Sequence, residues 1–187
     1  MKVVVCMLRG VNVGGHNKVA MEALRTLYAS LGLHDAQTYV QSGNVVFRTK
    51  ETNLVLLAAK IESAIERGFG FRPSVILRTT SELRAAIAAS PFAARSGIEP
   101  NKLLVTFLAG SPSAEARKKA VGIKADPEEL HIRERELYTY FPNGMARPKL
   151  SMARVERALK IPGTGRNWNT VSKLLEMAEK LEDKITA

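Results

Sequence analysis

The sequence has almost no cysteine and no apolar run long enough to cross a membrane. Cys6 is the single cysteine among 187 residues, so no internal disulfide can form and nothing indicates an oxidising compartment. The stretch 1–9 is apolar but short and lacks the cleavage site of a secretory signal, so it is interpreted as a strand. We therefore expect a cytoplasmic protein that does not engage membranes.

Histidine is also scarce, and the three histidines have no metal-ligand spacing to one another or to Cys6. Glu128 and Glu129 are adjacent, so their side chains would diverge on a strand rather than form an acid–base pair. A meeting of Cys6 and His16 near a strand end would lack a third, orienting group. The sequence therefore predicts no metal site and no cofactor, and whether the protein is an enzyme stays open.

Positive charge, by contrast, is plentiful. The chain has 28 Lys and Arg against 18 Asp and Glu, a net charge of +10, and the excess is shared evenly between residues 1–79 and 80–187. Such a balance favours an anionic partner, nucleic acid included, or serves solubility. The densest stretch, 143–175, has one acid, Glu156, and seven basic residues: Arg147, Lys149, Arg154, Arg157, Lys160, Arg166 and Lys173.

Hydrophobic spacing divides residues 1–79 into alternating strands and helices. Strands are expected at 2–8, 37–41, 45–48 and 74–78, and helices at 21–31 and 54–65. This βαββαβ order is typical of a ferredoxin-like subdomain, in which the third strand lies antiparallel between the first two. The loop 9–18 and the turn Ser42-Gly43-Asn44 should then lie at the same edge of the sheet.

Residues 80–187 show a similar order. A connecting helix at 81–89 precedes strands at 103–108, 130–133 and 137–141 and helices at 113–121 and 152–159. An extended piece near 162–166 takes the place of a regular fourth strand, and a final amphipathic helix covers 171–181. We predict an α+β fold with two ferredoxin-like subdomains, 1–79 and 80–187, the second with an atypical last strand and a C-terminal helix.

The loop 9–18 is the first candidate ligand-binding site. Its candidate residues are Arg9, Asn12, Gly14, Gly15, His16 and Lys18. Glycines let backbone N–H groups approach a ligand closely, and the N-terminus of a helix attracts an anion. The P-loop pattern is not met, because His16 and Asn17 stand where Lys and Ser or Thr are required. A tight strand-to-helix turn is the alternative to an anion site.

Two other segments contribute candidates. Ser42 and Asn44 suit a hairpin turn by themselves, and their predicted position beside the loop 9–18 adds them to the candidate site. The C-terminal candidates are Arg166, Asn167, Trp168, Asn169 and Lys173. These residues either present donors to an anionic group or base, or start the last helix, with Asn169 or Thr170 as its cap and Trp168 packed against the core.

The segment 67–71 matches the first part of an RNA-recognition signature. That signature works on the third strand, whose aromatic rings stack bases, whereas here the match precedes the fourth strand. We expect Phe69 and Phe71 to close the core under this loop.

Three separated motifs, in order along nearly the whole chain, resemble a bacterial family, the domain-of-unknown-function family 1697. They are Met7-Leu8-Arg9-Gly10 with Asn12-Val13-Gly14-Gly15, the run from Tyr39 to Phe47, and Arg166-Asn167-Trp168-Asn169-Thr170-Val171 followed by Lys173-Leu174. The resemblance implies an α+β fold with two related subdomains, and it implies no established activity.

The leading hypothesis is a binding module for a phosphate-bearing ligand, either nucleic acid or nucleotide. It would use the loop 9–18 with the turn 42–44, the basic segment 147–173, or both. One alternative is an enzyme that holds a small anionic metabolite with Arg9, Lys18 and Arg166 and uses His16 as acid or base. Another is a protein-interaction module without a ligand, which would expose an apolar patch. No feature of the sequence specifies an oligomeric state.

Overall fold

The computed structural model describes residues 1–123 and 126–186. It contains two compact units, Met1–Arg84 with Lys173–Ala187, and Ala85–Ser172. Each unit is built on a four-stranded antiparallel sheet. The division differs from the expected one at residue 79, because the chain from Lys173 onward groups with the first unit.

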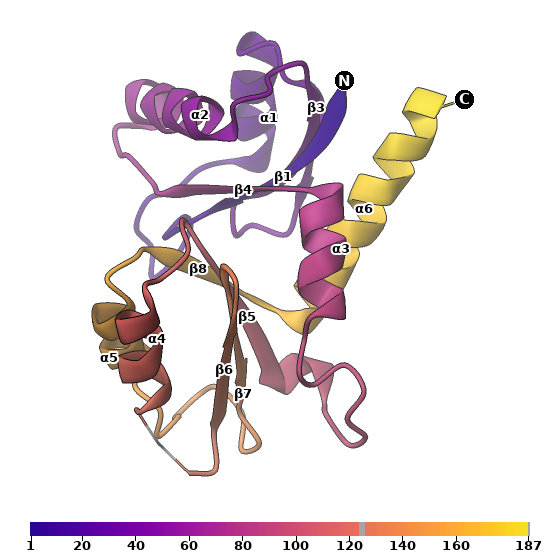
Figure 1. The fold of residues 1–187 in the computed structure, drawn as a ribbon. Coiled ribbons are helices and arrows are strands. Elements are labelled where there is room, and N and C mark those ends of the chain that lie inside the picture. Colours follow the sequence, from indigo (N-terminus) through magenta and orange to yellow (C-terminus); the bar gives the residue numbers. More distant parts are fainter. Residues whose placement is uncertain (124–125, 187) are drawn as a thin grey trace. The chain divides into compact units, whose positions relative to one another are not determined.

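The first unit has the strand order β2-β3-β1-β4. Its elements are β1 (Lys2–Leu8), α1 (Met21–Ser30), β2 (His34–Tyr39), β3 (Asn44–Thr49), α2 (Leu54–Phe69) and β4 (Val75–Thr79), followed by α3 (Thr80–Ala88). Both α1 and α2 cover one face of the sheet (Figure 1). The predicted ferredoxin-like arrangement is confirmed for this half.

Side-chain alternation along β1 explains how this half builds its core. Val4, Cys6 and Leu8 belong to the hydrophobic cluster that also takes in residues of α1 and α2. Within it, the rings of Tyr28 and Phe47 meet edge to face with centroids 5.3 Å apart. From Val3 to Leu8 the strand is apolar at every position because its opposite face is buried as well.

The ends of α2 are set by its flanking residues. The Asn53 side chain accepts hydrogen bonds from the backbone N–H groups of Val55 and Leu56, and Gly70 ends the helix in the left-handed conformation. Phe69 and Phe71 pack against the core as expected. Because residues 67–69 lie in a helix, the match to the RNA-recognition signature has no structural counterpart.

Strand β2 begins and ends earlier than its hydrophobic pattern predicts. It covers His34–Tyr39 rather than 37–41, and its register with β3 is irregular between His34 and Gln37. Val40 then adopts a φ of 49°, which turns the chain out of the strand. Positive φ at a β-branched residue is not foreseeable from propensity.

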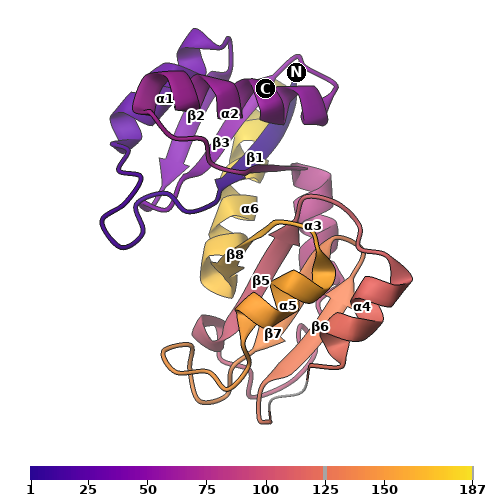
Figure 2. The ribbon, with the colours of Figure 1, turned by 90° about the vertical axis from the view of Figure 1, so that its left-hand side faces the viewer.

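The second unit has the strand order β6-β7-β5-β8, equivalent to that of the first. Its elements are the 3-10 helix η1 (Pro100–Lys102), β5 (Leu103–Leu108), α4 (Ala114–Val121), β6 (Glu129–Arg133), β7 (Glu136–Tyr140), α5 (Met152–Leu159) and β8 (Gly163–Asn167). Helix α6 (Trp168–Thr186) follows, and its residues from Lys173 onward group with the first unit. Figure 2 shows α4 and α5 side by side over one face of this sheet. No helix within the described residues is long and apolar enough to cross a bilayer.

The expected extended piece near 162–166 is a regular fourth strand. It pairs antiparallel with β5 from Leu104↔Asn167 to Leu108↔Gly163. A Cβ at Gly163 would lie 2.8 Å from Cγ2 of Thr106, so only glycine fits opposite β5 there. Close packing, rather than strand propensity, therefore shapes this strand.

Strand register shows that the two halves are duplicated in structure. Arg78, the fourth residue of β4, lies opposite Val5, and Arg166, the fourth residue of β8, lies opposite Val105. Both arginines are buried, with exposed fractions of 2% and 8%. The sequence shows no convincing residue-level repeat, but the two edge strands bury the same residue type at the same position.

Candidate functional site

One end of the first unit's sheet brings two of the predicted binding segments together. We call it the rim, made of the loop 9–20 and the turn 40–43. The backbone N–H of Leu8 donates to the Gly43 carbonyl at 3.0 Å, and Nδ2 of Asn12 donates to the Gln41 carbonyl at 2.8 Å. The predicted topology accounts for the proximity of the loop and the turn.

Asn12 holds the rim together. Its Nδ2 also donates to the Val19 carbonyl at 3.0 Å, and its Oδ1 accepts from the Val19 backbone N–H at 2.8 Å. Asn17 adds a bond from Nδ2 to the Gly10 carbonyl at 2.9 Å. The Asn12 amide is thus engaged within the protein on both of its polar atoms.

The remaining loop candidates lie on the outside of the rim. Gly14, Gly15, His16 and Lys18 are exposed, and Arg9 is half-buried, with its backbone N–H bonded to the Ser74 carbonyl. An open depression of about 390 Å³ lies here, lined by Asn12, Gly15, Lys18, Val19, Ala20 and Gln41. Among the described residues of this lining, Lys18 is the one cation.

Asn44 and Ser42 point into the rim rather than out of it. Asn44 is fully buried, and its Nδ2 donates to the Tyr39 carbonyl at 3.1 Å and to Oγ of Ser42 at 2.8 Å. These bonds stabilise the hairpin, which is the role that turn chemistry predicts for both residues.

The rim offers no acid–base pair between Cys6 and His16. Cys6 is buried, and its sulfur accepts a hydrogen bond from the Tyr28 hydroxyl at 3.0 Å. Burial, reinforced by Cys6, raises the pKa of Tyr28 well above its ordinary value. His16 is exposed and is not among the residues that line the rim depression. An acid–base role for His16 therefore gains no support from this geometry.

The C-terminal candidates are mostly used to end β8 and begin α6. Buried Arg166 donates from Nη1 to Oγ1 of Thr164 at 2.7 Å and to the Gly165 carbonyl at 2.9 Å. Asn167 accepts from the Thr170 backbone N–H at 2.8 Å. Asn167 is therefore the residue that caps α6, in place of the expected Asn169 or Thr170, because the helix begins at Trp168.

The other three residues of that set lie on α6 itself. Trp168 is half-buried and Asn169 is exposed. Lys173 donates from Nζ to both carboxylate oxygens of Glu176 at 2.9 Å. Lys173 falls in the first unit, whereas residues 166–169 fall in the second.

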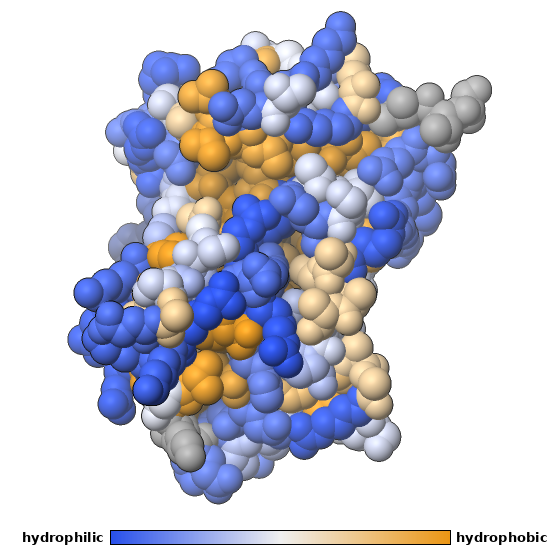
Figure 3. All heavy atoms as spheres, in the orientation of Figure 1, coloured by the Kyte–Doolittle hydropathy of each residue, from blue (hydrophilic) through white to orange (hydrophobic). Residues whose placement is uncertain are grey.

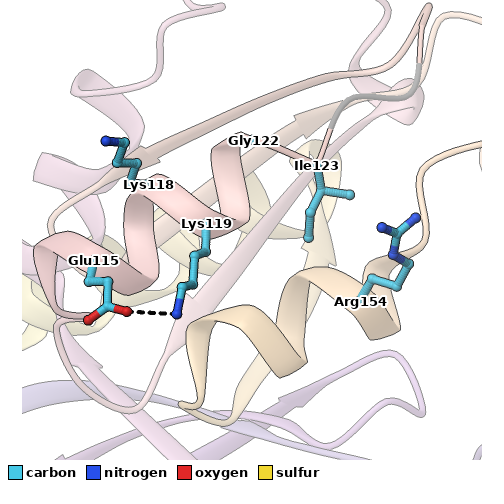
Figure 4. A pocket seen from close by; sticks show the side chains of 6 residues that line it. All are labelled: Glu115, Lys118, Lys119, Gly122, Ile123 and Arg154. Atoms are coloured by element: carbon cyan, nitrogen blue, oxygen red, sulfur yellow. Dashed lines mark ion pairs between the residues drawn. The ribbon is translucent and has the colours of Figure 1, made fainter.

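A second candidate surface lies on the helices of the second unit. We call it the basic face, made of the exposed cations of α4, of α5 and of the residue that caps the end of α5: Lys118, Lys119, Arg154, Arg157 and Lys160. An open groove of about 650 Å³ runs across it, lined by Glu115, Lys118, Lys119, Gly122, Ile123 and Arg154 (Figure 4). Hydrophilic residues gather over α4 and α5 in Figure 3.

Both helices are held firmly against their sheet. Oγ of Ser113 and of Ser151 accepts a backbone hydrogen bond at the start of α4 and α5, respectively. Ala116 and Ala120 face inward from α4, and Val155 and Leu159 face inward from α5. The cations stand on the opposite sides of these helices.

Among the described residues that line the groove there is one carboxylate, and it is already paired. Nζ of Lys119 lies 2.6 Å from Oε1 of Glu115. The hydrogen bond from Lys119 holds the pKa of the Glu115 carboxyl below its usual range, and the charge of Lys160 acts in the same direction. Among the described residues, no carboxylate is paired with Lys118, Arg154 or Arg157.

The sequence pattern indicates three of the five cations of the basic face. Arg154, Arg157 and Lys160 belong to the basic segment recognised above, but Lys118 and Lys119 precede that segment by more than twenty positions. The signal that joins them is the duplicated topology, which places both helices of a ferredoxin-like half on one side of its sheet. Applying that rule to 113–121 and 152–159 would have paired the two basic stretches.

Comparisons with known proteins agree with this fold. A conserved bacterial protein, SP0830 from Streptococcus pneumoniae, has a solved structure that is similar over 95% of this chain and 98% of that one, with a TM-score of 0.71 and 24% identity. At this identity the likeness shows the fold alone, and no curated protein matches the chain. The model of a family of proteins of unknown function (DUF1697) matches residues 1–138. The chain belongs to that family, as its motifs predicted.

Proposed function

We propose that the protein binds a phosphate-bearing polymer, nucleic acid, through the basic face of its second unit. The supporting observation is the groove across α4 and α5, in which Lys118 and Arg154 have no carboxylate partner among the described residues. Cations that are not already neutralised can displace counterions from a phosphate backbone, which is the main source of affinity in such complexes.

Shape favours a polymer over a single nucleotide. The groove is open, and the cations are distributed along both helices rather than focused on one point. Arg147 and Lys149, both exposed, extend the positive charge along the chain just before α5. The rim depression, in which Lys18 is the one cation among the described lining residues, would meet at most one phosphate.

Salt dependence of binding tests this function. Fluorescence anisotropy with a labelled 20-mer nucleic acid, read between 50 and 200 mM salt, should show affinity that falls steeply as salt rises. The double substitution Lys118→Ala with Arg154→Ala should weaken binding at least about tenfold. It should also reduce the log–log salt slope by about 2, because each phosphate that the protein neutralises contributes about 0.9 to that slope.

The matched control is Lys50→Ala with Arg67→Ala, which removes two exposed cations from the first unit and leaves the same net charge. This variant should keep most of the affinity. Absence of binding at 50 mM salt, equal weakening by both variants, or binding confined to a mononucleotide or to anionic phospholipid vesicles would each overturn the proposal.

A further inference from the structure

The cations of the basic face are presented by a rigid scaffold. Glu115, in the first turn of α4, lies at the end of the groove away from Arg154 (Figure 4). Ile123, just after α4, shares the groove with Arg154 in the first turn of α5. The two helices therefore run antiparallel, and each is anchored by buried residues and a serine cap. A fixed array of charges complements phosphates that are themselves regularly spaced.

The basic face has no ring on which a base could stack. The segments 113–122 and 142–160, which supply both helices and the chain leading into α5, contain no Phe, Tyr, Trp or His. Proteins that hold single-stranded nucleic acid combine cations with aromatic side chains, and each stacked base contributes about 1–3 kcal/mol. Without such rings, the face lacks the stacking contribution to single-strand affinity.

The packing of the two helices also argues against base reading by this face. A major groove about 12 Å wide admits one α-helix. Here α4 and α5 lie side by side on the sheet (Figure 2). Packed helices lie about 8–10 Å apart axis to axis, and each is about 10–12 Å across, so the pair is too wide to enter. Its cations can contact the phosphates that border the groove.

We infer, on the basis of the function proposed above, that the basic face binds double-stranded nucleic acid through its phosphates and without regard to sequence. Lys118 and Arg154, on the two sides of the groove, contact phosphates from separate helices. Arg157 follows Arg154 by one turn on α5 and extends the contact along the backbone.

The test compares ligands that carry nearly equal numbers of phosphates. Two 20-bp DNA duplexes of unrelated sequence and a 40-nucleotide single strand compete, one at a time, for the full-length protein against a labelled duplex at 100 mM salt. We expect both duplexes to compete within about twofold of each other and the single strand to compete about tenfold less well. The variant Lys118→Ala/Arg154→Ala should reduce this preference, whereas Lys50→Ala/Arg67→Ala should retain it.

A single strand that competes as well as the duplexes overturns the inference while leaving the proposed function standing. A difference of more than tenfold between the two duplexes overturns it as well, because it would show that bases are read. If neither ligand binds, the proposed function itself fails, and the two failures are therefore distinguishable.

Discussion

At the residue scale, Gly43 shows how tightly the rim is built. Its φ is 73°, and a Cβ there would lie 2.7 Å from Cβ of Leu8, closer than real Cβ atoms approach. We expect Gly43→Ala to lower the free energy of unfolding by about 2–4 kcal/mol, from overpacking and from left-handed strain together.

Gly10 is the matched control for that substitution. Its φ is 71°, but an added Cβ would meet nothing within 4 Å. Gly10→Ala should therefore cost only the conformational strain, about 1 kcal/mol. Urea unfolding of both variants measures the difference, and equal destabilisation of the two would show that the contact with Leu8 does not matter.

Asn12 is expected to matter for stability through its side chain. It has a φ of 54°, which glycine also tolerates, so Asn12→Gly keeps the backbone but removes three hydrogen bonds. We expect the free energy of unfolding to fall by about 1–3 kcal/mol and hydrogen exchange at the Val19 amide to become faster. Asn12→Ala should be worse, because it adds left-handed strain. An unchanged exchange rate at Val19 would show that the Asn12 side chain does not hold the rim together.

At the element scale, Glu115 on α4 competes with a bound phosphate for the ammonium group of Lys119. Glu115→Gln should release the lysine for a phosphate, raising nucleic-acid affinity several-fold and steepening the salt slope by about 1. Glu66→Gln, which removes a carboxylate from an exposed pair with Arg72 on the first unit, makes the same change in net charge. Anisotropy should show the increase for Glu115→Gln alone, and an equal increase for both would attribute it to net charge.

Helix α6 carries a testable charge cluster of its own. Hydrogen bonds from Lys180 and Lys173 lower the pKa of Glu176 to about 2. Since the folded pKa lies below the unfolded one, the ionised carboxylate stabilises α6 above about pH 4.5, and this stabilisation is lost as pH falls toward 2. The group is exposed, so the effect is small and weakens with salt.

Carbon-detected NMR titration of the Glu176 carboxyl group measures this pKa directly. Lys180→Gln should raise the pKa of Glu176, because this substitution removes the hydrogen bond from the Lys180 ammonium group. A titration midpoint near the ordinary glutamate value of about 4.3 in the unchanged protein would show that the cluster does not form in solution.

Much of the element order could be predicted from the sequence, because apolar periodicity is strong in strands such as β1 and β3. The fourth strand of the second unit could not, since the run Gly-Thr-Gly-Arg-Asn has no strand pattern and gains its conformation from pairing with β5. The sequence predicted that the loop 9–18 and the turn 42–44 lie side by side. It also suggested Asn12 and Asn44 as ligand-binding residues. Their engagement within the rim depends on tertiary partners that local sequence does not specify.

At the scale of the whole molecule, the net charge of +10 predicts an anionic partner but not a location. The two units of the structure differ in net charge. The first unit, counted as 1–84 with 173–187, has fourteen Lys and Arg against ten Asp and Glu, and the second, 85–172, has fourteen against eight. Duplicated folds have thus diverged in charge, and the larger surplus falls in the unit that carries the basic face.

An NMR titration shows which surface of the protein binds nucleic acid. Adding a short DNA duplex to the ¹⁵N-labelled full chain should shift the amide signals of α4, α5 and residues 147–149, while those of the loop 9–18 and of α2 stay in place. Shifts concentrated on the loop 9–18 instead, with α4 and α5 unaffected, would contradict the account.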